Sequence, residues 1–412
     1  MAIDPEELKR RRAQRKLQRE KKKHTLIVRL AIAGIVLVLA AILVIVLVSN
    51  RSDDNQKKPV EQSTQATAGE QTVIHLAAGG DLNINQAVVE AGGVNFDYTN
   101  AFMDVAHILA GADISAINFE GNLYGAPYGT DRSAPQELAT ALAKAGVDLV
   151  QLANSFSIYK GMEGLAGTIN GIRLAGMEPL GVYADTNAAK AGKGYTITTV
   201  KGIKIAFVAF TKGMDGMALP AGNEGCVNVL YKDYSTDYQK VDTEGITKVL
   251  DDVAREKPDL TVAFLHWGSE FNNNISASQK EIRTLMQEKG VDAIIGTHSH
   301  YVQQMVYDRN AGTFVAYSLG DFVGDAQRAG TEYSVILNLE ITKDHTTGQT
   351  SITNYNYVPI FTVVEEGKPL KVVRIREAMR AFEEGYIDRI SQETYDAMAY
   401  AMKRIEARVN GE

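Results

Sequence analysis

Hydrophobic positions fall into three kinds of stretch along the chain. Leu30–Val48 is an unbroken apolar run of 19 residues, and the Ser49–Thr72 stretch that follows is polar with few large apolar side chains. From Val73 onward, short apolar runs of strand length alternate with segments in which apolar residues recur every three or four positions. Such an alternation of strands and helices is typical of an α/β fold.

The apolar runs predict individual elements. We expect strands at 73–78, 114–119, 147–152, 179–182, 203–210, 260–265, 291–295 and 313–319, with later antiparallel strands at 332–341 and 350–364. We expect helices at 138–145, 164–175, within 234–254, and at 276–289 and 372–408. No internal repeat is visible.

Histidines end two successive strands of this pattern. His266 follows the run at 260–265, and His298 and His300 follow the run at 291–295. A single histidine at a strand end is more often a hydrogen-bonded structural residue. However, three of the seven histidines of the chain lie in this one unit. Because ligands gather beyond the carboxyl ends of strands in open α/β sheets, this clustering favours a metal site.

Three further polar residues also follow strand-like runs, namely Asp81, Glu120 and Asn154. Taken singly, Asp81 is better explained as a cap, Glu120 equally well as half of a salt bridge, and Asn154 as a turn residue. Their joint placement with the histidines argues for one site. Carboxylate and imidazole together suit Mn, Fe or Zn. Two such ions about 3.5–4 Å apart polarise a phosphoryl oxygen and lower the pKa of a bridging water.

The first 72 residues predict a membrane anchor. Residues 1–24 form a basic tail, 25–48 a transmembrane helix and 49–72 a flexible linker. The apolar run spans roughly 28 Å, which matches the hydrocarbon core. It is longer than a signal peptide requires and lacks a small-residue exit. The positive-inside rule then keeps the N-terminus in the cytoplasm and places the main domain outside the cell membrane in a single-pass arrangement.

Charge and cysteine content limit the possible partners and disulfide bonds of the chain. The net charge is −7, and eleven of the 43 Lys and Arg residues lie in the first 29 positions, so the remainder of the chain is more acidic. This balance argues against nucleic acid as a partner. Cys226 is the single cysteine, which excludes an internal disulfide.

Several motifs together resemble the CapA family of capsule-biosynthesis proteins, which act in poly-γ-glutamate synthesis and are related to calcineurin-like metallophosphatases. The matching blocks, in order, are Gly80-Asp81, Asn118-Phe119-Glu120, Leu152-Ala153-Asn154, His266-Trp267-Gly268-Ser269-Glu270, Gly296-Thr297-His298-Ser299-His300 and Tyr317-Ser318-Leu319-Gly320-Asp321-Phe322. The resemblance covers roughly residues 73–325. It implies a four-layer α/β/β/α sandwich, with a metallophosphatase-like domain at 73–330 and its last strands and terminal helices at 331–412.

The resemblance also implies roles for residues and partners. The implied metal ligands, for one or two divalent ions, are Asp81, Glu120, Asn154, His266, His298 and His300. His266 and Glu270 would be catalytic, and Trp267 would line the pocket with Glu270. The implied partners are the lipid bilayer, membrane-bound subunits that polymerise and export the polymer, and an anionic polymer or phosphoester substrate.

One departure from the family pattern leaves two functions open. The usual family histidine after the Asn-Asn pair is replaced by Phe156, and the following aspartate by Tyr159. Loss of a group that stabilises phosphoryl charge typically costs orders of magnitude in rate. The chain is then either a metal-dependent hydrolase or transferase at the cell surface, or a weakly active or inactive subunit that binds polymer or partner.

Overall fold

The computed structural model describes residues 70–324, 328–386 and 390–412, which form one compact unit. The predicted basic tail and transmembrane helix, and all but the last three residues of the predicted linker, lie outside these residues. Among the helices that the structure does describe, none is both long and apolar enough to cross a membrane.

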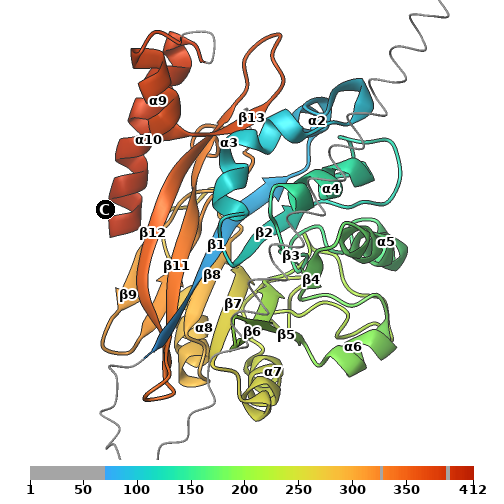
Figure 1. Ribbon diagram of the computed structural model, residues 1–412. Helices are drawn as coiled ribbons and strands as arrows, with labels where there is room; N and C mark the ends of the chain where they lie inside the picture. The colour runs from blue at the N-terminus through green and yellow to red at the C-terminus, as the bar shows by residue number, and fades with distance from the viewer. Residues whose placement is uncertain (1–69, 325–327, 387–389) are drawn as a thin grey trace, which may run out of the picture. The chain divides into compact units, whose positions relative to one another are not determined.

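The first sheet has seven strands (Figure 1). Their spatial order is β13 (Lys371–Arg374), β12 (Thr350–Val363), β11 (Tyr333–Asp344), β1 (Gln71–Asn83), β2 (Ile114–Glu120), β3 (Leu149–Gln151) and β4 (Glu178–Leu180). The four strands from β1 to β4 are parallel, whereas β11, β12 and β13 join them as antiparallel strands. The two late strands predicted to be antiparallel are therefore confirmed.

The second sheet has six strands. Their order is β5 (Tyr195–Val200), β6 (Ile203–Thr211), β7 (Leu260–His266), β8 (Ala293–Thr297), β10 (Thr313–Ala316) and β9 (Met305–Asp308). The central strands β6, β7, β8 and β10 are parallel, and the edge strands β5 and β9 are antiparallel to their neighbours. Parallel strands end at the same edge, so His266 at the end of β7 and the histidines that follow β8 are brought to one place.

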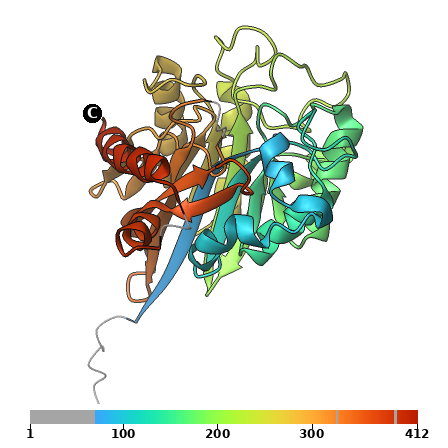
Figure 2. The same cartoon turned by 90° about the horizontal axis from the view of Figure 1, so that it is seen from above.

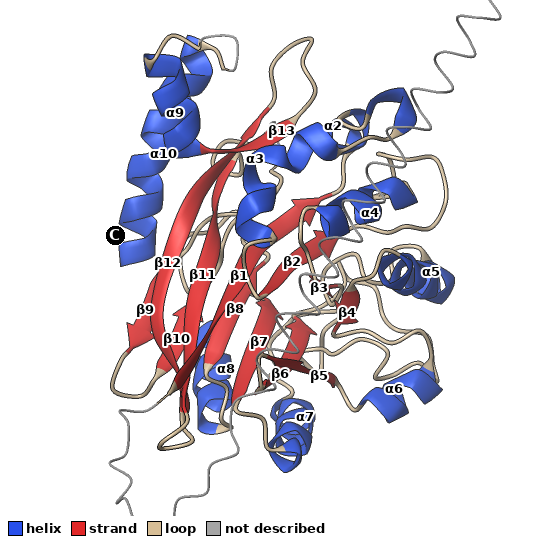
Figure 3. Cartoon of the chain, viewed as in Figure 1, coloured by secondary structure: helices blue, strands red, loops and turns tan. Residues whose placement is uncertain are grey.

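Helices cover the outer faces of both sheets (Figure 3). The helices are α2 (Gln86–Glu90), η1 (Gly93–Asn95), α3 (Thr99–Leu109), α4 (Gln136–Lys144), α5 (Gly161–Leu174), α6 (Thr186–Gly192), α7 (Thr243–Glu256), α8 (Ala277–Glu288), α9 (Ile375–Glu383) and α10 (Gln392–Asn410). Helices α3, α4 and α5 pack on the first sheet, and α7 and α8 on the second. The expected mixed α/β fold with two sheets is thus confirmed.

The largest core lies between the sheets. Alternate residues of β1 (Ile74, Leu76) and of β6 (Ile205, Phe207) meet in it, as period-two spacing requires. Apolar residues of α9 and α10 join this same core beside β11 and β12. Figure 2 shows these two C-terminal helices, in red, on the side of the molecule away from the green helices.

The prediction of one helix over 372–408 is wrong. Val372 and Val373 belong to strand β13, because they point to opposite sides of the first sheet and pair with β12. The helical part is divided into α9 and α10, and Gly385 follows the end of α9 with a φ of 91°. The helix sought within 234–254 begins only at Thr243, where the Asp242 side chain caps it. Helix α3 and strands β5 and β9 were not predicted.

Candidate metal centre

A pair of glycines places Asp81 near the end of β1. The pairing of β1 with β2 shifts register between Ala78 and Asp81, at Gly79 and Gly80. A side chain at Gly80 would collide with the carbonyl oxygen of Gly320. This close approach of two backbones lets the Asp81 amide donate to that same oxygen over 3.0 Å. Asp81 thereby faces the second sheet in a fully buried position.

The histidine loop after β8 has a strained backbone. His298 and His300 have φ values of 87° and 59°, a region that non-glycine residues rarely adopt. The amide of His298 donates to Asp81 Oδ2 over 3.0 Å, so a residue of the first sheet helps to hold this conformation. Such strain persists where surrounding contacts over-determine it, and it is concentrated at functional sites.

One group of candidate ligands consists of Glu120, His266 and His298. Glu120 ends β2 in the first sheet, and His266 ends β7 in the second. His266 Nε2 lies 3.1 Å from Glu120 Oε1 and 3.0 Å from His298 Nδ1. Although all three side chains are buried, Glu120 Oε2 and His298 Nε2 have no hydrogen-bond partner.

The second group consists of Asp81, His300 and Asp321. His300 Nδ1 lies 2.8 Å from Asp321 Oδ1 and 3.6 Å from Asp81 Oδ2. Asp321 belongs to one of the family motifs in the sequence but was not predicted to be a ligand. A signal was present, because Gly320-Asp321 follows a strand-like run just as Gly79-Gly80-Asp81 does.

Two asparagines connect the groups. The Asn118 amide donates to Asp81 Oδ1 over 2.6 Å, and its oxygen accepts from Asn154 Nδ2 over 3.0 Å. The Asn154 oxygen accepts from the backbone amide of Phe156 over 2.9 Å. Asn154 therefore lies at the site, where its amide organises Asn118, and its role as a direct ligand stays a prediction.

Burial and mutual charge set the protonation of these groups. Burial, together with the negative charge of Asp81, raises the pKa of Glu120 well above its ordinary value. Burial also lowers the pKa values of His266 and His298 far below the usual range, which keeps both rings neutral. For His300, burial lowers the pKa, but the nearby carboxylates, Asp321 foremost, outweigh it and raise the pKa to about 10.

The donor set fits a divalent cation. Neutral imidazole nitrogens and carboxylate oxygens are the ligands that Zn, Mn and Fe accept. The two buried atoms without partners, Glu120 Oε2 and His298 Nε2, are each able to bind such an ion. Buried carboxylates that are costly to ionise alone are stabilised when a cation is present. The residues therefore fit one or two metal ions.

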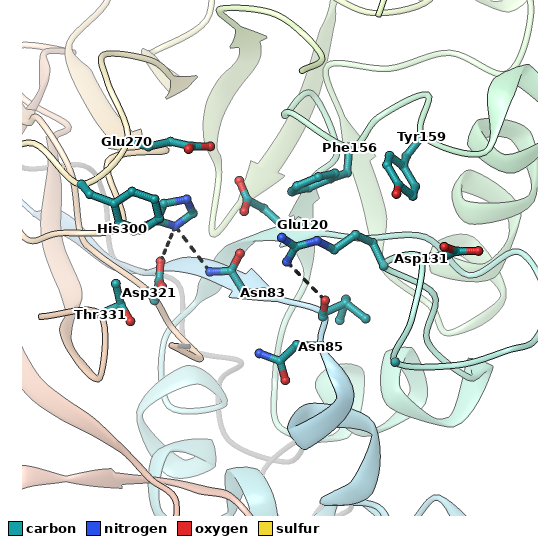
Figure 4. A pocket seen from close by; sticks show the side chains of 14 residues that line it. Asn83, Asn85, Glu120, Asp131, Phe156, Tyr159, Glu270, His300, Asp321 and Thr331 are labelled. Atoms are coloured by element: carbon teal, nitrogen blue, oxygen red, sulfur yellow. Dashed lines mark hydrogen bonds and ion pairs between the residues drawn. The ribbon is translucent and has the colours of Figure 1, made fainter. Parts of the chain in front are cut away.

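A cavity of about 380 Å³ opens onto this cluster (Figure 4). It is lined by Asn83, Ile84, Asn85, Glu120, Gly129, Asp131, Arg132, Phe156, Tyr159, Glu270, Phe271, His300, Asp321 and Thr331. Figure 4 shows His300 joined to Asp321 and Asn83 at the cavity wall. Glu270, predicted to be catalytic, lines this cavity as an exposed residue.

Arg132 lines this cavity and was not predicted from the sequence. Its guanidinium lies 4.4 Å from the centroid of the Phe156 ring and donates to the carbonyl of Ile84 over 3.3 Å. Asp131 and Arg132 have φ values of 50° and 53°, and the Asn122 side chain binds both of their carbonyls. The strained turn thus holds the Arg132 guanidinium against Phe156, the residue that replaces the family histidine.

Trp267 does not line the cavity, contrary to prediction. Its ring is buried in the outer core of the second sheet, where it stacks on Tyr317 at a centroid distance of 5.7 Å. Its indole N–H donates to the Tyr317 carbonyl over 2.9 Å. Trp267 follows His266 directly, and neighbouring side chains of an extended chain point to opposite faces.

The fold and the site together define a class of protein. It is a two-sheet α/β protein whose strand ends carry carboxylate and imidazole side chains that fit a metal ion. Residues 75–326 match the family described as "Bacterial capsule synthesis protein PGA_cap", and the chain belongs to that family. The resemblance to CapA-type proteins is thereby confirmed.

Two relatives support the same family. The chain is 25% identical over 317 residues to the capsule biosynthesis protein CapA of Bacillus anthracis, covering 74% of this chain and 70% of that protein. It is 24% identical over 262 residues to the PGA biosynthesis protein CapA of Bacillus subtilis, covering 61% of this chain and 62% of that protein. It thus spans less than two thirds of the second relative.

Solved phosphatases are more distant. A phosphatase from Mycoplasma pneumoniae is 14% identical with a TM-score of 0.45, over 78% of this chain and 100% of that one. A calcineurin-like phosphoesterase from Bacillus subtilis is 15% identical with a TM-score of 0.42, over 81% and 100% of the two chains. Similarity at this level assigns no activity.

Proposed function

We propose that this protein is a membrane-anchored, extracellular component of capsule or poly-γ-glutamate synthesis or export that works through a divalent metal centre. The observation that carries the metal centre is the pair of buried atoms without partners, Glu120 Oε2 and His298 Nε2, within a set of six carboxylate and imidazole side chains. The apolar run at 30–48 behind a basic tail supports the anchor. Family membership supports the part in capsule synthesis.

The residues would divide the work between two groups. Glu120, His266 and His298 would hold one ion, while Asp81, His300 and Asp321 would hold a second. A bound divalent ion supplies Lewis acidity toward a phosphoryl or carbonyl oxygen. Asn118 keeps the carboxylate of Asp81 oriented.

Arg132 would hold the anionic group of a substrate. It lines the cavity that opens onto the metal ligands, and a guanidinium binds carboxylate or phosphate with two parallel hydrogen bonds. Stacking on Phe156 restricts the side chain before the substrate arrives. Arg132 would therefore supply charge stabilisation that Phe156, in place of the family histidine, cannot supply.

Phe156 also supports a second function. Phe156 has no group that can donate a proton or a hydrogen bond, and Glu270, which was predicted to be catalytic, is exposed. A subunit that binds anionic polymer or membrane-bound synthase and export subunits without cleaving a bond would tolerate both features. This alternative keeps the metal site and removes the hydrolysis.

Elemental analysis of the purified full-length chain tests the metal centre. We expect stoichiometric Mn, Fe or Zn in the wild type and its loss in the double variant His298→Ala/His300→Ala. The matched control is His75→Ala/His107→Ala, which removes two exposed histidines and should retain the metal. A folded wild type without metal after growth with all three ions would contradict the proposal.

Surface polymer separates the two functions, and protease treatment of intact cells tests the location. His298→Ala should abolish the polymer if metal chemistry is required, and spare it if the protein is a pure scaffold. External protease should digest the domain from residue 70 onward in intact cells. Protection of that domain until the cells are lysed would contradict an extracellular location.

A further inference from the structure

A second cavity of about 380 Å³ lies apart from the metal centre and shares no lining residue with the first. Its walls are the loop before α8, the loop that follows the histidines, and the last turns of α10. The lining residues are Asn273, Asn274, Ile275, Lys280, Val302, Gln303, Gln304, Arg404, Arg408, Gly411 and Glu412.

Arg408 is the unusual residue of this cavity. It is 8% exposed, yet its Nε and Nη1 atoms have no hydrogen-bond partner. Its guanidinium lies 4.8 Å from the Tyr301 ring centroid and 5.5 Å from that of Tyr333. No carboxylate of the described residues forms an ion pair with it. Burial lowers the pKa of Arg408, and the positive charge of Arg404 acts in the same direction against the opposing effect of Tyr333.

Arg404 adds a second cation one helical turn away. It lines the same cavity, its Nε atom has no partner, and it too makes no ion pair with any described residue. Like charges four residues apart on a helix repel each other. A buried guanidinium without a counter-charge is destabilising, so an anion between the two would offset both this cost and the repulsion.

Gln303 gives the cavity a directional acceptor. Its side chain is 2% exposed, and its Nε2 donates to the carbonyl of Asn272 over 2.7 Å. That bond fixes the orientation of the amide, because only the nitrogen can donate to a carbonyl. The other atom, Oε1, is buried without a partner and requires an N–H or O–H donor.

We propose that this cavity binds a carboxylate-bearing amide. Arg404 and Arg408 hold the carboxylate, and the amide N–H of the same ligand donates to Gln303 Oε1. The volume suits one or two amino-acid-sized units and lies in the range of small-ligand sites. The inference stands on α10 and the 302–304 loop, and it does not rest on the metal centre or on the proposed function.

Titration calorimetry of the full-length chain with three probes tests the proposal. The probes are N-acetylglutamate, glutarate, which has the carboxylates but no amide, and inorganic phosphate. N-acetylglutamate should bind about five-fold more tightly than glutarate, since one net hydrogen bond contributes about 1 kcal/mol. Phosphate, titrated into the His298→Ala/His300→Ala variant so that the metal centre does not bind it, should bind more weakly than either. Equal or tighter binding of phosphate would make the cavity a general oxyanion site and overturn the proposal.

Variants assign the contacts. Arg408→Met removes the charge at similar volume and should weaken N-acetylglutamate binding at least ten-fold, and Arg404→Ala should act in the same direction. Gln303→Leu should abolish the preference over glutarate while glutarate still binds. The matched control is Lys403→Ala, an exposed cation of α10 outside the cavity.

Two further outcomes keep the test decisive. Replacing an unpaired buried charge by a methionine should leave the free protein at least as stable, so lost binding will not mean lost folding. The variant His298→Ala/His300→Ala should bind N-acetylglutamate as the wild type does. Binding that disappears there but survives Arg408→Met would place the ligand at the metal centre and overturn the proposal, as would the absence of saturable binding.

Discussion

The guanidinium of Arg132 lies over the ring of Phe156, 4.4 Å from its centroid, at the wall of the cavity beside the metal ligands. The two residues are 24 positions apart in the sequence, and neither belongs to a helix or strand. Phe156 alone suggests a site that has lost a charge-stabilising group. The pair suggests that the charge has moved from one loop to another.

Arg132→Ala should weaken phosphate binding at the metal-loaded cavity by about ten- to a hundred-fold, the range for a charged hydrogen-bonding group. Phe156→Leu should have a smaller effect of several-fold, because it removes only the stacking surface. Calorimetry in an Arg408→Met background limits the measurement to this cavity. Arg173→Ala, an exposed arginine elsewhere, is the control. Unchanged binding in Arg132→Ala would remove this residue from the site.

Asp321→Ala should lower the metal content more than Asp321→Asn does. The carboxylate lies 2.8 Å from His300 Nδ1 and belongs to the second group of candidate ligands. Loss of such a carboxylate in Asp321→Ala should lower the metal affinity by about 10- to 100-fold. The amide of Asp321→Asn keeps one oxygen and should therefore cost less. Metal-buffered titrations measure the difference. Full occupancy in Asp321→Ala would show that the second group holds no ion.

Trp267→Phe should destabilise the fold and leave the metal content unchanged. The substitution removes the hydrogen bond to the Tyr317 carbonyl and leaves part of a buried volume empty. We expect the free energy of unfolding to fall by about 1–3 kcal/mol in urea titrations. If metal is lost while stability stays the same, the sequence-based placement of Trp267 in the pocket would be right after all.

Much of the site could be predicted from local sequence. His266, His298, Asp81 and Glu120 each follow a strand-like run, and the shared edge of parallel strands brings such residues together. Trp267 was misplaced because its motif suggests a neighbour of His266, whereas the alternation of side chains turns it into the outer core.

The missed residues depend on contacts between distant segments. Arg132 belongs to a turn whose shape is fixed by Asn122, and Asn118 gains its meaning only when Asp81 and His266 approach it from two different sheets. The buried side-chain atoms of Arg408 and Gln303 that have no hydrogen-bond partner likewise come together only when α10 lies against the loop after the histidines. No local pattern carries that information.

Asp292→Asn should change the pH dependence of stability. Burial raises the pKa of Asp292 from 3.8 to about 6, although its carboxylate accepts from the Thr261 amide. The folded state therefore holds a proton that the unfolded state has released, and the free energy of unfolding falls as pH rises from about 4 to about 6.

The Asp292→Asn variant does not titrate at this position. Its free energy of unfolding should exceed that of the wild type by on the order of 2 kcal/mol at pH 7, with little difference at pH 4. Urea unfolding at a series of pH values measures both. Asp185→Asn, a substitution at a helix cap, is a control for acid-to-amide changes in general. Parallel curves for wild type and Asp292→Asn would show that this carboxylate ionises freely in the folded state.

The candidate ligands come from both sheets, since Asp81 and Glu120 belong to the first and His266 and His298 to the second or the loop after it. An ion held there would be a clamp between two layers whose shared core is apolar. Metal at a hundred times its dissociation constant would then add about 2.7 kcal/mol to the free energy of unfolding. Separate halves of the chain would each lack part of the clamp, so metal affinity would report whether the two layers have docked.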